Sequence, residues 1–418
     1  MKTKLFILIL FGQFIFTNVL AQWTTLNSGT LRSLNRVDFP SVNIGYILPF
    51  SGPLLRTTNA GVSWDSISSI TLFGSSLYDN NICFVNDSVG FITTHNNAGN
   101  ARLYKTMNMG NTWTDISPLN ATNDIFKVHF LNAQKGYLYA NTNFNDRFWS
   151  TDNGGTSWTE DSLGFSLGSG TNSLPIMFFV NDSTGYIAGS DGSFLYRGVI
   201  AKTIDHGKHW SLKTLPQSGS LINDIHFHSE DTGYVISADG LLFRTTNKGS
   251  TWDSISRLNT TSYIKIFFIN GKTGFVISGT NIYKTTDAGI TWNLQPSGTS
   301  HWLWSVYFPD PNTGYIVGDS GTILKTSLGG TSSIKEISND EQFFTLYPNP
   351  STHNITIELK NSLSGSDFKI YDNKGSLVKH MALTEQKTII DISDLAAGVY
   401  YLSLINQNRI CRQKLILY

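Results

Sequence analysis

Charged side chains are scarce in this 418-residue sequence. They make up 14% of the residues, and 30 basic side chains balance 30 acidic ones to give no formal net charge. A nucleic-acid-binding protein needs a basic surface to meet the phosphates, and an anionic membrane attracts a similar excess of lysine and arginine. The composition therefore argues against nucleic acid as a partner and predicts neutral ligands.

Cysteine is nearly absent as well. The sequence holds two cysteines, Cys83 and Cys411, which fall in regions that we assign below to different domains. We therefore expect no disulfide between them and a fold that is held together by its apolar core.

Long apolar runs are missing after the first residues. Residues 1–21 begin with two lysines, continue as an apolar run over 5–16 and end in Ala21. This is the pattern of a secretory signal peptide that is cleaved before Gln22. No later segment approaches the roughly 18 apolar residues of a membrane-spanning helix. We expect a soluble mature protein without a transmembrane segment.

One pattern recurs seven times along the chain. An aromatic residue is followed six residues later by glycine, at intervals of 40 to 49 residues. The pairs are Phe39/Gly45, Phe84/Gly90, Phe130/Gly136, Phe179/Gly185, Phe227/Gly233, Phe268/Gly274 and Phe308/Gly314. Each pair opens a unit of about four short apolar stretches, the signature of a propeller blade. The repeat predicts an all-β fold of radially arranged blades.

Six units end in a segment of the form Thr-x-Asn/Asp-x-Gly-x-x-Trp. These segments resemble Asp-boxes, also called bacterial neuraminidase repeats. Their amide or carboxylate and tryptophan positions are Asn59/Trp64, Asn108/Trp113, Asn153/Trp158, Asp205/Trp210, Asn247/Trp252 and Asp287/Trp292. A short polar side chain can bond the amides of a hairpin, glycine permits positive φ, and tryptophan buries a large area between sheets. Because an amide replaces the carboxylate in four of the six boxes, we predict structural residues and no metal site.

The seventh unit lacks its tryptophan, and the missing residue is found at the other end of the mature chain. Trp23 precedes Phe39 by sixteen residues, as Trp292 precedes Phe308. We predict seven blades over residues 22–333, with the N-terminal segment as the outer strand of the last blade, so that no edge is left unpaired. The alternative is that Trp23 belongs to a frayed terminus.

Several families carry such boxes on a propeller, including sialidases, sortilin-type receptor ectodomains and xyloglucanase-type glycosidases. The cadence of residues 242–252 and 306–326 is most similar to the photosystem II stability/assembly factor group. The residues that carry this resemblance are scaffold residues. The resemblance therefore implies a fold and says little about a photosynthetic role.

The repeat ends in a polar stretch, residues 334–344, which we interpret as a linker. Residues 345–418 then begin with Leu346-Tyr347-Pro348-Asn349-Pro350 and continue as alternating strands with a basic, apolar end. This segment is similar to the type A C-terminal sorting domain of the type IX secretion system of Bacteroidota. The resemblance implies Sec export, outer-membrane passage through that machinery, and release or surface attachment. The alternation itself predicts a small β-sandwich of about seven strands, and an ordinary adhesive sandwich is the alternative.

Candidate ligand-binding residues lie just before the repeated phenylalanines, where the loops around the channel mouth vary. The residues that suit stacking on sugar rings or gripping a peptide are Tyr78, Phe126, Asn223, Trp302 and Trp304. The alternative for the tryptophan pair is packing at a blade junction. Three residues before the phenylalanines lie Arg36, Lys127, Asp224 and Lys265, which we expect to be solvated or paired charges.

Catalytic residues are harder to nominate. No position matches the arginine clamp and Tyr/Glu pair of sialidases. A xyloglucanase-type enzyme needs two facing aspartates, and Asp124 with Asp224 is the pair available. His129 and His226 occupy a position that also accepts Phe and Cys, so we interpret them as packing residues. We expect no cofactor and a monomer.

Three functions stay open. The leading hypothesis is a secreted or surface-displayed protein whose propeller binds a glycan or a protein. The alternatives are an extracellular glycoside hydrolase that uses the same channel mouth and an assembly factor.

Overall fold

The computed structural model divides the chain into two compact units, Met1–Thr331 and Ser332–Tyr418. The structure describes residues 23–72, 81–95, 101–118, 124–142, 145–165, 167, 176–190, 197–215, 220–259, 264–327, 335–336, 344–359, 366–372, 377–406 and 409–418. In these segments no helix has the length and apolar character needed to cross a bilayer. The predicted signal peptide, residues 1–21, lies outside the described residues.

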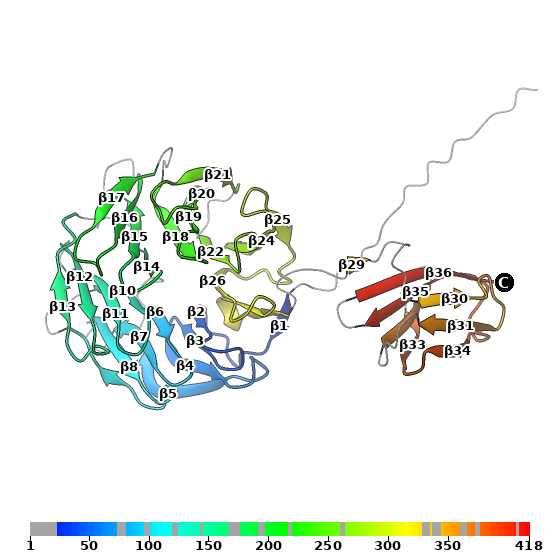
Figure 1. The fold of residues 1–418 in the computed structure, drawn as a ribbon. Coiled ribbons are helices and arrows are strands. Elements are labelled where there is room, and N and C mark those ends of the chain that lie inside the picture. Colours follow the sequence, from blue (N-terminus) through cyan, green and yellow to red (C-terminus); the bar gives the residue numbers. More distant parts are fainter. Residues whose placement is uncertain are drawn as a thin grey trace, which may run out of the picture. The chain divides into compact units, whose positions relative to one another are not determined.

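The first unit is a seven-bladed β-propeller, and its described residues form seven four-stranded antiparallel sheets (Figure 1). The strands of each blade are given from the innermost outwards. Blade 1 consists of β2 (Leu34–Asp38), β3 (Gly45–Pro49), β4 (Gly52–Thr57) and β5 (Asp65–Leu72), and blade 2 of β6 (Asn81–Phe84), β7 (Gly90–His95), β8 (Ala101–Thr106) and β9 (Thr114–Asp115). Blade 3 consists of β10 (Asp124–Phe130), β11 (Gly136–Thr142), β12 (Asn145–Thr151) and β13 (Thr159–Asp161). Blades 4 and 5 are β14 (Ile176–Phe179), β15 (Gly185–Ser190), β16 (Gly198–Thr203), β17 (Ser211–Thr214); and β18 (Ile222–Phe227), β19 (Gly233–Ser237), β20 (Leu241–Thr245), β21 (Asp253–Arg257). Blades 6 and 7 are β22 (Ile264–Phe268), β23 (Gly274–Ser278), β24 (Asn281–Thr285), β25 (Asn293–Gln295); and β26 (Leu303–Tyr307), β27 (Gly314–Gly318), β28 (Ile323–Thr326), β1 (Thr24–Leu26). A short 3₁₀ turn, η1 (Asp319–Gly321), lies between β27 and β28.

The recurring Phe/Gly pair is explained by cross-strand packing. Phe130 at the end of β10 lies directly opposite Gly136 at the start of β11. A Cβ atom added to Gly136 would come within 2.3 Å of the Phe130 ring, and the other six pairs show the same close approach, at 2.3 to 2.7 Å. The phenylalanine ring therefore takes the place of a side chain on the neighbouring strand, and only glycine leaves room for it.

Aromatic contacts join the blades. Each repeated phenylalanine stacks on the aromatic residue that follows the glycine of the preceding blade, as Phe84 does on Tyr46 with ring centroids 3.6 Å apart. The tryptophan of its own blade meets the same ring edge-on, as Trp113 does with centroids 6.3 Å from Phe84. Edge-to-face and offset pairs contribute about 0.5–1.5 kcal/mol each beyond their buried area. Blade order is thus fixed by side chains that the repeat itself supplies.

The other box tryptophans make the same edge-on contact with the repeated phenylalanine of their own blade. The pairs and their centroid distances are Trp64 with Phe39 at 6.0 Å, Trp158 with Phe130 at 6.1 Å, Trp210 with Phe179 at 6.2 Å, Trp252 with Phe227 at 5.9 Å and Trp292 with Phe268 at 6.1 Å.

The box tryptophans are buried to different extents. We expected each indole to bury a large area between neighbouring sheets, and Trp252 is 7% exposed. The other five are half-buried, namely Trp64, Trp113, Trp158, Trp210 and Trp292. Each of the six stands directly before the outermost strand of its blade. The inner edge of the indole packs on phenylalanine while part of the ring stays open to solvent.

The indole N–H groups of these tryptophans are used in different ways. Trp210 Nε1 donates to Gly207 O of its own box at 2.8 Å, and Trp158 Nε1 donates to Ile116 O of the preceding blade at 2.8 Å. Trp64 Nε1 is buried without a hydrogen-bond partner among the described residues. The ring contact is therefore common to all the boxes, whereas the polar contact of the indole varies from blade to blade.

The ring closes through the N-terminal segment. β1 pairs with β28, with Thr25 opposite Leu324, which confirms the strand pairing predicted from the position of Trp23. Trp23 is 2% exposed and meets Phe308 at 6.1 Å, as the box tryptophans do in other blades. Tyr315 of blade 7 stacks on Phe39 of blade 1 at 3.9 Å. The last blade therefore joins the first by the contacts used everywhere else in the ring.

The box turns are held by their own polar groups. In blade 1 the Thr57 hydroxyl accepts the N–H of Gly61 at 2.9 Å, and Asn59 Oδ1 accepts the N–H of Ser63 at 2.9 Å. Equivalent bonds recur at Asn108, Asn153, Asp205, Asn247 and Asp287. Gly61 has φ of +79°, and a Cβ there would lie 3.0 Å from Leu26 of β1. The box position therefore serves equally well with an amide or a carboxylate.

The second unit is a small β-sandwich. A five-stranded sheet, in the order β29-β36-β35-β32-β33, packs with a three-stranded sheet, β30-β31-β34. Their bounds are β29 (Lys335–Glu336), β30 (Phe344–Tyr347), β31 (Asn354–Leu359), β32 (Ser366–Tyr371), β33 (Leu377–Leu383), β34 (Lys387–Asp391), β35 (Gly398–Asn406) and β36 (Arg409–Leu417). Residues from both sheets, including Ile357 and Leu402, form one buried cluster. β29 lies in the segment that we expect to be a linker and pairs in parallel with β36.

Candidate ligand-binding site

The two ends of the propeller are built differently. The box turns are bonded to the Phe-to-Gly turns, for example through Ala60 N–H to Asn43 O at 2.9 Å and Met109 N–H to Ser88 O at 3.0 Å. Both kinds of turn therefore occupy one end. The other end is formed by the segments that lead into the innermost strands and by the hairpins between the second and third strands of each blade.

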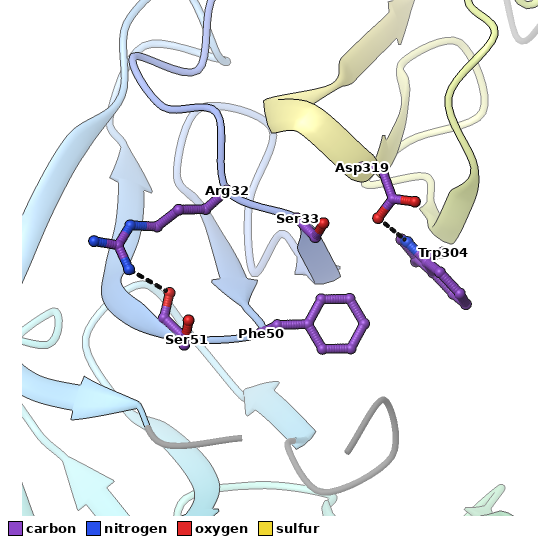
Figure 2. A pocket seen from close by; sticks show the side chains of 6 residues that line it. All are labelled: Arg32, Ser33, Phe50, Ser51, Trp304 and Asp319. Atoms are coloured by element: carbon purple, nitrogen blue, oxygen red, sulfur yellow. Dashed lines mark hydrogen bonds between the residues drawn. The ribbon is translucent and has the colours of Figure 1, made fainter. Parts of the chain in front are cut away.

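A pocket opens at this second end, between blades 7 and 1 (Figure 2). Its volume is about 440 Å³, and it is lined by Arg32, Ser33, Phe50, Ser51, Trp304 and Asp319. Arg32 and Ser33 precede β2, Phe50 and Ser51 belong to the β3–β4 hairpin, and Asp319 begins η1. This volume is within the range of small-molecule sites, which is about 300–1,000 Å³.

Trp304 forms one wall of the pocket. The pairing of β26 with β27 shifts register between Leu303 and Ser305, so Trp304 stands at a β-bulge. Its Nε1 donates to Asp319 Oδ1 at 2.7 Å, and its ring meets Phe50 edge-on with centroids 5.7 Å apart. Trp304 is 6% exposed because these contacts cover its ring, so the expectation that its indole face is open for stacking on a sugar was wrong.

Trp302 is the exposed member of the pair. It is 44% exposed, and its ring lies 5.6 Å from that of Trp304, with 38° between the planes. The carbonyl of Trp302 accepts the N–H of Asp319 at 2.8 Å, so the backbone that carries the ring is anchored to η1. An indole that is held in place and open to solvent offers a flat apolar surface for a ligand at little cost in side-chain entropy.

The η1 turn connects the two sides of the pocket. Gly321 N–H donates to Arg32 O at 2.8 Å, and a Cβ on Gly321 would lie 1.9 Å from Thr30 O. On the side of the pocket opposite Trp304 and Asp319, Arg32 Nη1 donates to Ser51 O at 3.2 Å (Figure 2). The pocket thus brings aromatic rings, one guanidinium and one carboxylate together on short, anchored turns.

The structure gathers only some of the predicted residues. Trp302 and Trp304 lie together, whereas Asn223 stands half-buried at a β-bulge in blade 5 and does not line this pocket. Tyr78 and the side chains of Asp124 and Phe126 lie outside the described residues.

Sequence reasoning missed Arg32, Phe50 and Asp319 as lining residues. They lie in loops that the repeat does not fix. The sequence does mark the two hairpins that carry Phe50 and Asp319 by their glycine-containing turns, Phe50-Ser51-Gly52 and Gly318-Asp319-Ser320-Gly321.

Asp224 is engaged within the fold. Its Oδ1 pairs with Lys265 Nζ at 2.9 Å, and its Oδ2 accepts the N–H of Ile266 at 2.9 Å. Both oxygens therefore tie blade 5 to blade 6. Across the described residues, no set of three or more His, Cys, Asp and Glu side chains is arranged to hold a metal ion.

A ring of side chains lines the channel one residue before each repeated phenylalanine. This inner ring consists of Asp38, Cys83, His129, Phe178, His226, Phe267 and Tyr307. His226 Nε2 lies 3.0 Å from Phe268 O of the next blade, and its ring is 4.5 Å from that of Phe267. Burial lowers the pKa of both His129 and His226 to about 4. Burial also raises the pKa of Asp38 to about 7, although Phe84 N–H donates to its carboxylate at 2.6 Å.

The inner-ring histidines predict a loss of stability in acid. A histidine with a folded-state pKa of about 4 contributes stability that is complete above its ordinary value of 6.5 and is lost as the pH falls towards 4. We expect His226→Phe, which copies the residue found in blades 4 and 6, to reduce the loss of unfolding free energy between pH 7 and pH 5 by about 1–2 kcal/mol. Urea denaturation at the two pH values measures this difference. An unchanged pH dependence would contradict a His226 that stays neutral in the folded state at pH 5.

Two family models match parts of the chain. Residues 172–300 match the model for the photosynthesis system II assembly factor YCF48, and residues 345–418 match the secretion system C-terminal sorting domain. No curated protein sequence matches the chain. The C-terminal unit is therefore a type IX sorting domain, and the chain is an exported protein of the cell surface or the surrounding medium that carries a YCF48-like propeller.

Solved structures share this propeller fold at low identity. YCF48 bound to D1 peptide is 13% identical, with a TM-score of 0.57 over 73% of this chain and 96% of that one. PorZ of Porphyromonas gingivalis, described as an essential bacterial surface component of the type IX secretion system, is 15% identical, with a TM-score of 0.55 over 92% of this chain and 59% of PorZ. A GH74 xyloglucanase from Xanthomonas campestris is 14% identical, with a TM-score of 0.58 over 81% of this chain and 59% of the enzyme. At these identities the likeness shows the fold alone.

Proposed function

We propose that this protein is a secreted or surface-displayed binding protein whose propeller holds a glycan or protein ligand at the pocket between blades 7 and 1. The mature chain would begin at Gln22, with a propeller over residues 22–333, a linker over 334–344 and a sorting domain over 345–418. The observation that carries the binding role is the exposed ring of Trp302 beside the pocket formed by Trp304, Phe50 and Arg32.

The chemistry of the pocket favours binding over hydrolysis. A glycosidase needs two carboxyl groups about 5–9.5 Å apart. Among the residues that line the pocket, Asp319 is the one carboxylate, and it accepts the indole N–H of Trp304. Asp224, one half of the nominated pair, is occupied by Lys265 and the backbone of blade 6.

The same surface suits two kinds of neutral ligand. A pyranose ring would stack on Trp302, and its hydroxyls would meet Arg32 and the second carboxylate oxygen of Asp319. A peptide would use the aromatic walls and the carbonyls of the hairpins. The YCF48 structure with a D1 peptide and the surface location described for PorZ make a protein ligand the alternative within this proposal.

Replacing Trp302 tests the binding role. We expect Trp302→Ala in the mature chain to weaken ligand binding by about tenfold or more, since a stacking aromatic contributes about 1–3 kcal/mol. A glycan array, followed by a panel of extracted cell-surface proteins, identifies the ligand, and calorimetry measures the change in affinity.

A matched control separates this effect from general loss of apolar surface. Tyr401 in the sorting domain has a similar exposure, and Tyr401→Ala should bind as the unmodified protein does. Equal binding by Trp302→Ala and the unmodified chain would place the ligand elsewhere and end this proposal.

A further inference from the structure

Charged side chains face one another across the propeller channel, three residues before the repeated phenylalanines. This channel charge cluster consists of Arg36 on β2, Lys127 on β10, Asp224 on β18 and Lys265 on β22. Blade 3, which carries Lys127, is not a neighbour of blades 1, 5 or 6. The electrostatic interactions of Lys127 with Arg36, Asp224 and Lys265 therefore cross the channel. The cluster therefore occupies the centre of the ring, separate from the pocket between blades 7 and 1.

The backbone shapes this cluster. Strands β2, β10 and β18 each shift register at the residue directly before the charged one, ahead of Arg36, Lys127 and Asp224. A β-bulge bends its strand and re-aims the following side chain, and bulges are frequent next to functional sites.

The side chains of the channel charge cluster differ in the hydrogen bonds and ion pairs that they make with described residues. Asp224 gives Oδ1 to Lys265 and Oδ2 to the Ile266 N–H. Arg36 donates to Asn35 Oδ1 at 2.8 Å. Lys127 is 7% exposed, and within the described part of the chain its ammonium has neither an ion pair nor a hydrogen bond. It faces two like charges, Arg36 and Lys265, and a single carboxylate that is already in use.

The Lys127 side chain is largely removed from solvent, which disfavours its charged form. The pKa of Lys127 lies well below its ordinary value because of burial, and then because of the positive charges of Arg36 and Lys265. A buried charge is retained when it is paired or coordinates a ligand. Asp38, two residues after Arg36 on β2, accepts the N–H of Phe84 at 2.6 Å.

We propose that the channel charge cluster binds an oxyanion, a phosphate or carboxylate group, with Lys127 as its principal donor and Arg36 and Lys265 completing the positive site. The anion supplies the counter-charge that Lys127 lacks among the described side chains. Binding fixes the charged form of Lys127, so it is accompanied by uptake of a proton from solution. The site takes either the free anion or the acidic group of a larger molecule.

Phosphate stabilisation of the mature chain tests this proposal. Melting temperatures are measured in sodium phosphate and in sodium chloride at equal ionic strength, with acetate and citrate as carboxylate probes. We expect a saturable rise with phosphate in the unmodified protein. Lys127→Met should weaken phosphate binding by about tenfold or more, since it removes the charge-assisted hydrogen bond from the ammonium. Lys127→Arg, which keeps the charge, should retain much of the rise.

The controls separate binding from the general effect of phosphate on protein surfaces, which stabilises folded states by exclusion. Lys272→Met removes an exposed lysine from the Phe268-to-Gly274 turn, at the end of the propeller that carries the box turns. This variant should respond to phosphate as the unmodified protein does. Calorimetry in two buffers of different ionisation enthalpy reports the proton uptake. A phosphate response that is equal in the unmodified protein and Lys127→Met would overturn the proposal. So would the absence of any stabilisation beyond that in chloride by phosphate, acetate and citrate alike. If citrate stabilises and phosphate does not, the site takes a carboxylate.

Discussion

Trp23→Ala will lower the free energy of unfolding of the propeller by about 3–5 kcal/mol, the typical cost of removing a buried tryptophan. Trp23 is 2% exposed and contacts both Phe275 and Phe308 edge-on, at 5.9 and 6.1 Å. It also anchors the segment whose strand β1 completes blade 7. Its loss leaves a cavity between blades 6 and 7. Urea denaturation followed by circular dichroism measures the change.

Two variants make the result specific. Within the described residues Trp23 Nε1 has no hydrogen-bond partner, so Trp23→Phe keeps the aromatic contacts and should cost far less than the alanine variant. Trp302→Ala removes an exposed indole and should leave stability nearly unchanged. A loss of less than 1 kcal/mol in Trp23→Ala, below the range expected for any buried tryptophan, would show that β1 does not contribute to closure.

Removal of residues 345–418 will abolish appearance of the protein outside the outer membrane and leave the propeller in the periplasm. This segment matches the sorting-domain model and folds around its own core of residues from both sheets of the sandwich. The aromatic contacts that close the propeller come from blades alone, so the truncated chain should still fold. Cell fractionation with an antibody to the propeller measures the distribution.

A point variant distinguishes sorting from a general folding defect. Leu402→Asp places a charge in the sandwich core and should also block export, whereas Leu377→Asp alters an exposed position of the same unit and should not disturb the core. Export of the truncated chain at the normal level would contradict a sorting role for residues 345–418.

The fold follows from the sequence because its contacts repeat. A phenylalanine that lies over a cross-strand glycine, such as Phe130 over Gly136, leaves a fixed spacing that periodicity reveals. The sixteen-residue offset from Trp23 to Phe39 reproduces the offset in other blades, so ring closure could also be read from spacing. These contacts are local or lie between neighbouring blades, and they recur in each blade.

The candidate site could be predicted only in part, because it is built from what differs between blades. The sequence predicted that Trp302 and Trp304 lie on one side of the strand entry, yet their spacing did not show that the bulge at Trp304 buries one ring and leaves Trp302 exposed. Phe50 and Asp319 come from hairpins of different blades, and their meeting depends on ring closure. The pairing of Asp224 with Lys265 likewise joins strands that are far apart in sequence.

Hydrogen–deuterium exchange of the mature chain with its ligand tests the central claim most directly, which is that the propeller binds at the pocket between blades 7 and 1. The account predicts that saturating ligand slows exchange in the β3–β4 hairpin around Phe50 and in η1, and that Trp302→Ala removes this protection. Protection confined to the box turns at the opposite end, or protection that persists in Trp302→Ala, would contradict it.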